Sequence, residues 1–151
     1  MRITLAYIGS RPRPQDPYDS LVRDYLKRSA TVAQCDAQVF RDEGGFFEWL
    51  SRQRGRTEAQ VLLLDAIGRQ MTSEQLAAWL GARRDEGVQH LIFAVGPADG
   101  WSQAARGEGK RRGGLLSLGP MTLAHQLARL VMAEQIYRAC TILTGHPYHR
   151  G

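Results

Sequence analysis

Two continuous apolar runs constrain most strongly how this chain of 151 residues can fold. The first is VLLLDAIG, from Val61 to Gly68, and the second is HLIFAV, from His90 to Val95. A strand that is apolar on both faces is typical of a parallel sheet with helices on both sides. The runs therefore predict buried parallel strands at 61–68 and 90–95.

Segments between and around these runs carry further strand and helix signals. Asp16 before Pro17 predicts a helix start, and Thr72 with Gln75 predicts a capping box. Further strands are predicted at 2–8, 37–40 and 114–118, and helices at 17–29, 46–53, 73–85 and from about Thr122 onward. Strands that alternate with helices predict one α/β domain over 1–151, with a mostly parallel sheet flanked by helices.

The last predicted helix carries apolar residues on more than one side. They are Leu123, Leu127, Leu130, Val131, Ile136, Tyr137, Cys140 and Leu143. A large exposed apolar stripe is unusual on a monomer, so this helix predicts that a second copy of the chain covers it in a symmetric dimer.

Charge and cysteine content narrow the class of protein. Twenty Lys and Arg against fifteen Asp and Glu give a net charge of +5, which favours an anionic partner such as nucleic acid. The basic stretch RGEGKRRGG, at 106–114, is interpreted as a mobile arm on RNA phosphates or as a solvated loop.

Cys35 and Cys140 fit neither a CxxC motif nor a disulfide framework, and no run approaches the roughly 18 apolar residues of a membrane span. These features predict a reduced, cytoplasmic protein without a metal.

The carboxyl ends of three predicted strands are candidate ligand loops, because ligands bind there in open parallel sheets. These loops are 64–68, GPADG at 96–100 and LSLGPMTLAH at 116–125. None of them matches GxGxxG or GxxxxGK[ST], which excludes the usual dinucleotide fingerprint and the P-loop.

Together with the terminal HPYHR, the stretches GPADG and LSLGPMTLAHQLARLVMAEQIYRA resemble the ribosomal large subunit methyltransferase H family of SPOUT methyltransferases. The resemblance runs from Met1 to Arg150. It implies a sheet threaded into a deep trefoil knot, a homodimer and S-adenosylmethionine as cofactor. It also implies methylation of N3 of a pseudouridine in helix 69 of 23S rRNA, in assembled ribosomes.

The same resemblance implies a cofactor site made by three loops. Leu64 would close over the adenine, and Gly96 would present its backbone. The rest of the implied cofactor set is Leu118, Gly119, Pro120, Met121, Thr122 and Leu123. The family usually has a second glycine where this chain has Pro97, and a proline where it has Ala124. Proline has no N–H, so a contact through that amide would be lost.

The terminal segment GHPYHRG would form the site for the target base. Tyr148 could stack on or hydrogen-bond a flipped base, and His149 could assist loss of the N3 proton. Arg150 and Arg138 could hold phosphate or stabilise the base anion.

Structural interpretations stand beside these roles. Glu134 and Arg138 have the spacing of a helix-stabilising pair, and His125 suits capping or packing better than base catalysis. His146 and His149 could be surface residues, and two histidines without a third ligand do not predict zinc.

Two other functions remain open at this point. One is a noncatalytic basic RNA-binding or ribosome-associated module, and the other is a knotted methyltransferase that acts on another RNA such as tRNA. Binding of S-adenosylmethionine in the absence of RNA separates the module from either enzyme.

Overall fold

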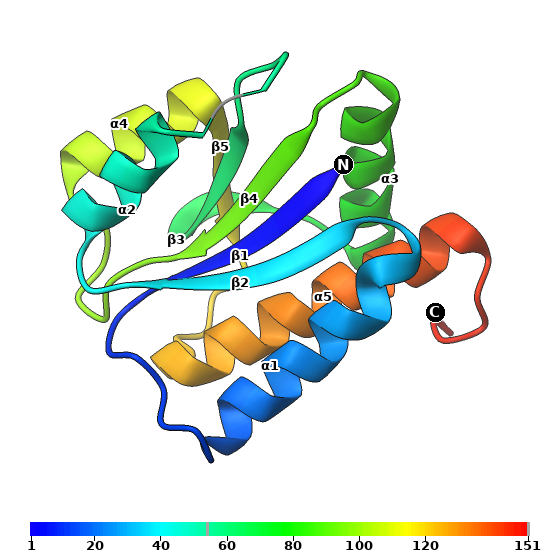
Figure 1. Cartoon of the computed structure of the whole chain (residues 1–151), viewed down its shortest axis with the longest axis horizontal. Helices are drawn as coiled ribbons and strands as arrows, with labels where there is room; N and C mark the ends of the chain where they lie inside the picture. Colours follow the sequence, from blue (N-terminus) through cyan, green and yellow to red (C-terminus); the bar gives the residue numbers. More distant parts are fainter. Residues whose placement is uncertain (54, 151) are drawn as a thin grey trace.

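The computed structural model describes residues 1–53 and 55–150 and contains a five-stranded sheet in the order β2-β1-β4-β3-β5 (Figure 1). Every neighbouring pair is parallel, which confirms the predicted sheet type. The strands are β1 (Arg2–Ile8), β2 (Gln34–Phe40), β3 (Gln60–Gln70), β4 (His90–Val95) and β5 (Gly113–Ser117).

Helices cover both faces of the sheet, as the apolar strands predict. They are α1 (Pro17–Arg28), the short 3₁₀ turn η1 (Ser29–Thr31), α2 (Glu43–Ser51), α3 (Ser73–Asp85), α4 (Gln103–Arg112) and α5 (His125–Thr144). One buried cluster packs α1, α3 and α5 on one face, and a second packs α2 and α4 on the other. The sheet is therefore the middle of three layers (Figure 1).

Two predicted helix starts are confirmed by their hydrogen bonds. The Asp16 carboxylate accepts from the amides of Tyr18 and Asp19, with Pro17 at the first helical position. The Thr72 hydroxyl accepts from the Gln75 amide, and the Gln75 side chain accepts from the Thr72 amide. Both caps satisfy amides that the first helical turn leaves without partners.

Several predicted boundaries are wrong by a few residues. β2 begins at Gln34 rather than at residue 37, and β5 covers 113–117 rather than 114–118. α2 begins at Glu43 because Asp42 caps it through the Gly45 amide, so both glycines lie inside the helix rather than before it. β3 continues to Gln70, and it is fully buried only at Val61–Leu63.

The basic segment 106–114 is not a loop or a mobile arm, because most of it lies in α4. The Ser102 hydroxyl caps this helix at the Ala105 amide, and Glu108 pairs with Arg111 and Arg112 one turn later. Gly109 lets the helix approach the sheet, since a Cβ there would lie 2.5 Å from Leu63 Cδ1.

α5 begins at His125 rather than at Thr122, and most of its apolar sides are covered within the chain. α5 lies between α1 and α3 and packs on β1 and β4. Met132, Ala133 and Ile136 are buried by these contacts, whereas Leu127 stays 37% exposed. The predicted reason for a dimer, an uncovered helix, is therefore wrong for most of α5. Within the described residues no helix is long and apolar enough to cross a membrane.

Candidate functional site

A cavity of about 310 Å³ opens at the carboxyl ends of β4 and β5 and beside Leu64–Ala66 in the middle of β3, so the predicted ligand loop at 64–68 is part of a strand. All eight residues predicted to bind the cofactor line it: Leu64, Gly96, Leu118, Gly119, Pro120, Met121, Thr122 and Leu123. The structure thus brings three segments that are separated in sequence to one cavity, here called the loop pocket. Its volume lies at the lower end of the range for small-ligand sites.

Trp101 fixes two of the segments that line the loop pocket, the middle of β3 and the loop after β4. Its indole Nε1 donates to the Leu64 carbonyl at 3.0 Å, and its side chain is only 4% exposed. At Gly96, an added Cβ would lie 2.5 Å from Trp101 Nε1. Glycine at position 96 is therefore a steric requirement of the indole.

His125 closes the loop pocket from the start of α5. Its ring stacks on Tyr7 at a centroid distance of 4.5 Å, its Nε2 bonds the Gly96 carbonyl, and its Nδ1 lies 3.1 Å from the Tyr7 hydroxyl. A carbonyl only accepts, so Nε2 carries the proton and Nδ1 accepts from Tyr7. These contacts confirm the packing role predicted for His125.

The segment between β5 and α5 forms an open lip. Ser117 Oγ bonds the Gly119 amide and carbonyl, and Gly119 has φ of 122°, a conformation that favours glycine. Met121 is 80% exposed, and Ala124 precedes α5 without a side-chain cap. Pro97 also lines the loop pocket and has no amide hydrogen to offer a ligand.

An ion pair in the loop pocket was not predicted from the sequence. Arg106 Nε lies 2.7 Å from the Asp65 carboxylate, whose side chain is 5% exposed. Asp65 lies where the pairing of β3 with β5 is interrupted, between Leu64 and Arg69, and it also accepts from the Ile67 amide. The pair ties α4 to β3 over 41 positions, which is why no local pattern reveals it.

The four residues predicted to be catalytic do not line the loop pocket of their own chain. Arg138 lies several turns beyond His125 on α5, a distance of about 20 Å at about 1.5 Å per residue. Tyr148 packs on Tyr137 at 4.7 Å, and its hydroxyl donates to Glu134 at 3.3 Å. Partial burial and the Glu134 charge raise the pKa of Tyr148 to about 12, so its hydroxyl keeps its proton at neutral pH.

His149 and Arg138 hold the terminal segment 145–150, here called the tail, against α5 and α3. Arg138 Nε donates to Glu134 at 2.9 Å, which confirms the predicted helical pair, and its guanidinium also lies over the Tyr148 ring at 4.7 Å. His149 bonds Arg138 at 3.0 Å and Glu74 at 2.7 Å. Arg150 is exposed.

Neither cysteine has the character of a reactive thiol or a metal ligand. Burial raises the pKa of Cys35 to about 12 and that of Cys140 to about 11. Both are free thiols. Across residues 1–53 and 55–150, no three His, Cys, Asp or Glu side chains are grouped to hold a metal ion.

Comparisons with known proteins agree with this architecture. Residues 1–149 match the sequence profile of a family described as "Predicted SPOUT methyltransferase". The chain is 42% identical over 151 aligned residues to "Ribosomal RNA large subunit methyltransferase H" of Koribacter versatilis, covering 100% of this chain and 99% of that protein. It is 39% identical over 157 aligned residues to the protein of the same name in Pelobacter propionicus, covering 99% of both.

One solved structure is similar in fold. It is "Ribosomal RNA small subunit methyltransferase E" from Neisseria gonorrhoeae bound to S-adenosyl methionine, with a TM-score of 0.51 and 17% identity. The match covers 88% of this chain and 64% of that one.

Proposed function

Since this chain belongs to the SPOUT methyltransferase family, we propose that it transfers a methyl group from S-adenosylmethionine to RNA of the large ribosomal subunit. The relatives from Koribacter and Pelobacter carry the name of such an enzyme, and this chain aligns with nearly their whole length. The observation that carries the proposal is the loop pocket, which collects all eight predicted cofactor residues. The proposed target is N3 of a pseudouridine in helix 69 of 23S rRNA, in assembled cytoplasmic ribosomes.

The loop pocket suits this cofactor chemically. Its lining is largely aliphatic side chains, glycines and backbone, which can enclose an adenine and read its edge through N–H and C=O groups. Leu64 and Leu118 supply apolar surface, and Gly96 accommodates the Trp101 indole beside the pocket. When bound, S-adenosylmethionine supplies an activated methyl group. The protein's part is to bind and orient the reacting groups.

The distance from the tail to the loop pocket supports a homodimer. Tyr148 and His149 rest beside Glu134 and Glu74, whereas the loop pocket opens at the far end of α5. A tail held in this way completes only a site that belongs to another molecule. We therefore assign each tail to the loop pocket of a second copy, in a symmetric dimer, and we propose that each sheet carries the deep trefoil knot that the resemblance implies.

Roles for the tail follow from its chemistry. Tyr148 presents a ring for stacking on the target base. His149 accepts the N3 proton, through an Nδ1 that becomes free when Arg138 turns toward an RNA phosphate. Arg150 and Arg138 neutralise the phosphate or the base anion.

The test is methylation of large ribosomal subunits purified from cells that lack this protein, with tritiated S-adenosylmethionine. Mass spectrometry of the rRNA then locates the modified nucleotide. Wild type is expected to label one nucleotide in helix 69, and a variant truncated after Pro147 is expected to be inactive but dimeric by light scattering. Labelling of tRNA instead, or full activity of the truncated variant, would contradict the proposal.

Calorimetry separates this enzyme from a noncatalytic RNA-binding module. The proposed enzyme binds S-adenosylmethionine without RNA, because the loop pocket is already formed in the chain alone. Absence of binding would favour the module.

A further inference from the structure

Two further cavities adjoin the loop pocket along the carboxyl edge of the sheet, toward β1 and β2. The first part, about 540 Å³, shares Pro97, Ala98 and His125 with the loop pocket. The second part, about 600 Å³, shares Gly9 and Ser10 with the first. We call these two adjoining cavities together the edge groove.

The edge groove is lined by two arginines and two carboxylates, and within the described part of the chain its arginines form no ion pairs. Arg41 lines both parts and Arg11 lines the second, and both side chains are exposed. Neither has a carboxylate partner among the residues that the structure describes, whereas Arg23 and Arg52 each pair with an acid one helical turn away.

The nearby acids are already engaged. Asp42 accepts from the Gly45 amide as the cap of α2. Glu43 accepts from the amide and the hydroxyl of Ser102. Both carboxylates line the first part of the edge groove and keep their negative charge, but among the described residues neither forms an ion pair with Arg41, so its guanidinium is free to bind a phosphate.

Gln126 adds an acceptor without a donor. It lines the first part of the edge groove together with Arg41, and its Oε1 is buried with no hydrogen-bond partner among the described residues. A buried acceptor without a donor costs stability, so such an atom marks a place where a bound ligand can supply the donor.

We infer that the edge groove binds the sugar-phosphate backbone of the RNA strand next to the target nucleotide. The guanidinium groups of Arg11 and Arg41 each donate two hydrogen bonds to phosphate oxygens in bidentate geometry. The Gln126 carbonyl accepts from a ribose 2′-hydroxyl. The inference rests on the proposed function, since it extends the RNA path away from the reacting base. Phosphate contacts set the register of the strand, and the loop pocket and tail act on the base.

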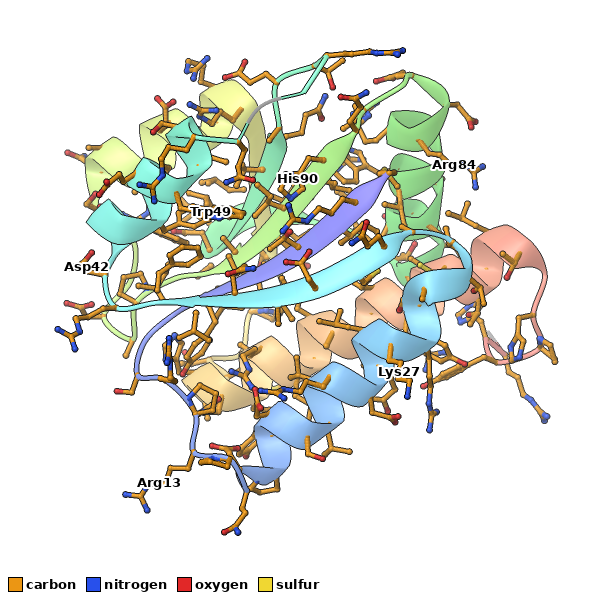
Figure 2. All side chains as sticks on the ribbon, in the orientation of Figure 1. Arg13, Lys27, Asp42, Trp49, Arg84 and His90 are labelled. Atoms are coloured by element: carbon orange, nitrogen blue, oxygen red, sulfur yellow. The ribbon has the colours of Figure 1, made fainter. Side chains whose placement is uncertain are left out.

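The main test is the double variant Arg11→Gln with Arg41→Gln. Its matched control is Arg52→Gln with Arg84→Gln, which removes the same charge from the ends of α2 and α3. Asp42 lines the edge groove, and Figure 2 shows Arg84 at the opposite edge of the molecule. The control pairs are exposed, so their loss has little effect on stability.

The measurement is the initial rate of methylation against the concentration of large ribosomal subunits. For the groove variant we expect KM to rise at least about tenfold, with the Kd for S-adenosylmethionine unchanged by calorimetry. Salt dependence is expected to weaken, since each lost phosphate contact lowers the slope of log K against log salt by about 0.7 on a single strand. The control variant is expected to match wild type.

Gln126→Met provides an uncharged test. Methionine keeps the length of the side chain and removes the oxygen without a donor, so we expect equal or higher thermal stability together with a raised KM. If the groove variant has the same KM and salt slope as wild type, the inference is overturned. The proposed function still stands in that case, because the wild-type protein methylates its RNA. If wild type itself methylates no ribosomal RNA, the proposed function fails, and fluorescence anisotropy with a labelled helix 69 RNA decides the groove alone.

Discussion

His149 Nε2 lies 2.7 Å from Oε1 of Glu74, so the end of the chain is attached to the first turn of α3. The other ring nitrogen, Nδ1, lies 3.0 Å from Arg138 Nη1. A guanidinium only donates, so Nδ1 accepts and the His149 proton is on Nε2, pointing at Glu74. The two neighbours thus select one tautomer and hold the tail in one orientation.

Glu74→Ala is expected to lower the methylation rate several-fold with only a small change in melting temperature, because Glu74 is exposed in the first turn of α3 and holds the tail through His149. A backbone hydrogen bond and then the His149 contact lower the pKa of Glu74. The carboxylate therefore stays charged at neutral pH. It loses its charge, and with it this contact, only when the pH falls through the lowered pKa of Glu74. Glu86→Ala, at the other end of α3, removes the same charge and should leave the rate unchanged. Equal rates in both variants would contradict a positioning role.

The buried ion pair between α1 and α5 predicts unequal effects of its two deletions. Arg129 Nη2 lies 3.0 Å from Asp19, the two side chains are 3% and 12% exposed, and the guanidinium lies 4.9 Å from the Tyr7 ring centre. Asp19→Ala leaves a buried guanidinium without a carboxylate, which costs about 3–5 kcal/mol. Arg129→Met is expected to cost about 2 kcal/mol or less, because Asp19 keeps its pair with Arg23. Urea unfolding measures both, and a costlier Arg129→Met would refute this ranking.

Local signals in the sequence predict the sheet and two helix starts, because caps and apolar runs act within a few residues. α4 was missed since its surface is polar, and what fixes it is the approach of Gly109 to Leu63 in a distant strand. Two contacts of the site were missed because they too join residues that lie far apart in the sequence. Trp101 bonds Leu64 and Arg106 pairs with Asp65 across about 40 positions, and no pattern of neighbours encodes such contacts. The eight pocket residues were predicted from the family resemblance, and most of them follow the carboxyl ends of β4 and β5.

Gly96→Ala is expected to lower affinity for S-adenosylmethionine at least about tenfold. The new Cβ would lie 2.5 Å from Trp101 Nε1, so the indole must move and release the Leu64 carbonyl. Calorimetry measures the affinity. Gly107→Ala is the matched control, since a Cβ there meets nothing within 4 Å, and it should bind as wild type does. Wild-type affinity in Gly96→Ala would show that the loops tolerate displacement of the indole.

A polar network at the amino edge of the sheet predicts loss of stability in acid. Thr4 is fully buried, and its Oγ1 donates to Asp36 at 3.0 Å and accepts from His90 Nε2 at 2.8 Å. His90 also meets Trp49 edge-on, with the two residues side by side in Figure 2. Burial and then the Arg2 charge lower the pKa of His90, although Asp36 opposes this.

Because its folded pKa lies below the usual value of about 6.5, His90 binds a proton more readily in the unfolded chain. Its contribution to stability is therefore present above pH 6.5 and is lost as the pH falls through the lowered value. Asp36 acts in the same direction at lower pH: burial alone would raise its pKa, but hydrogen bonds from Arg2, Gln38 and Thr4 lower it. Melting temperatures between pH 7.5 and pH 5 should fall in wild type and fall less in His90→Gln. His146→Gln, in the exposed part of the tail, should follow wild type, and equal slopes in all three proteins would exclude His90 as the source.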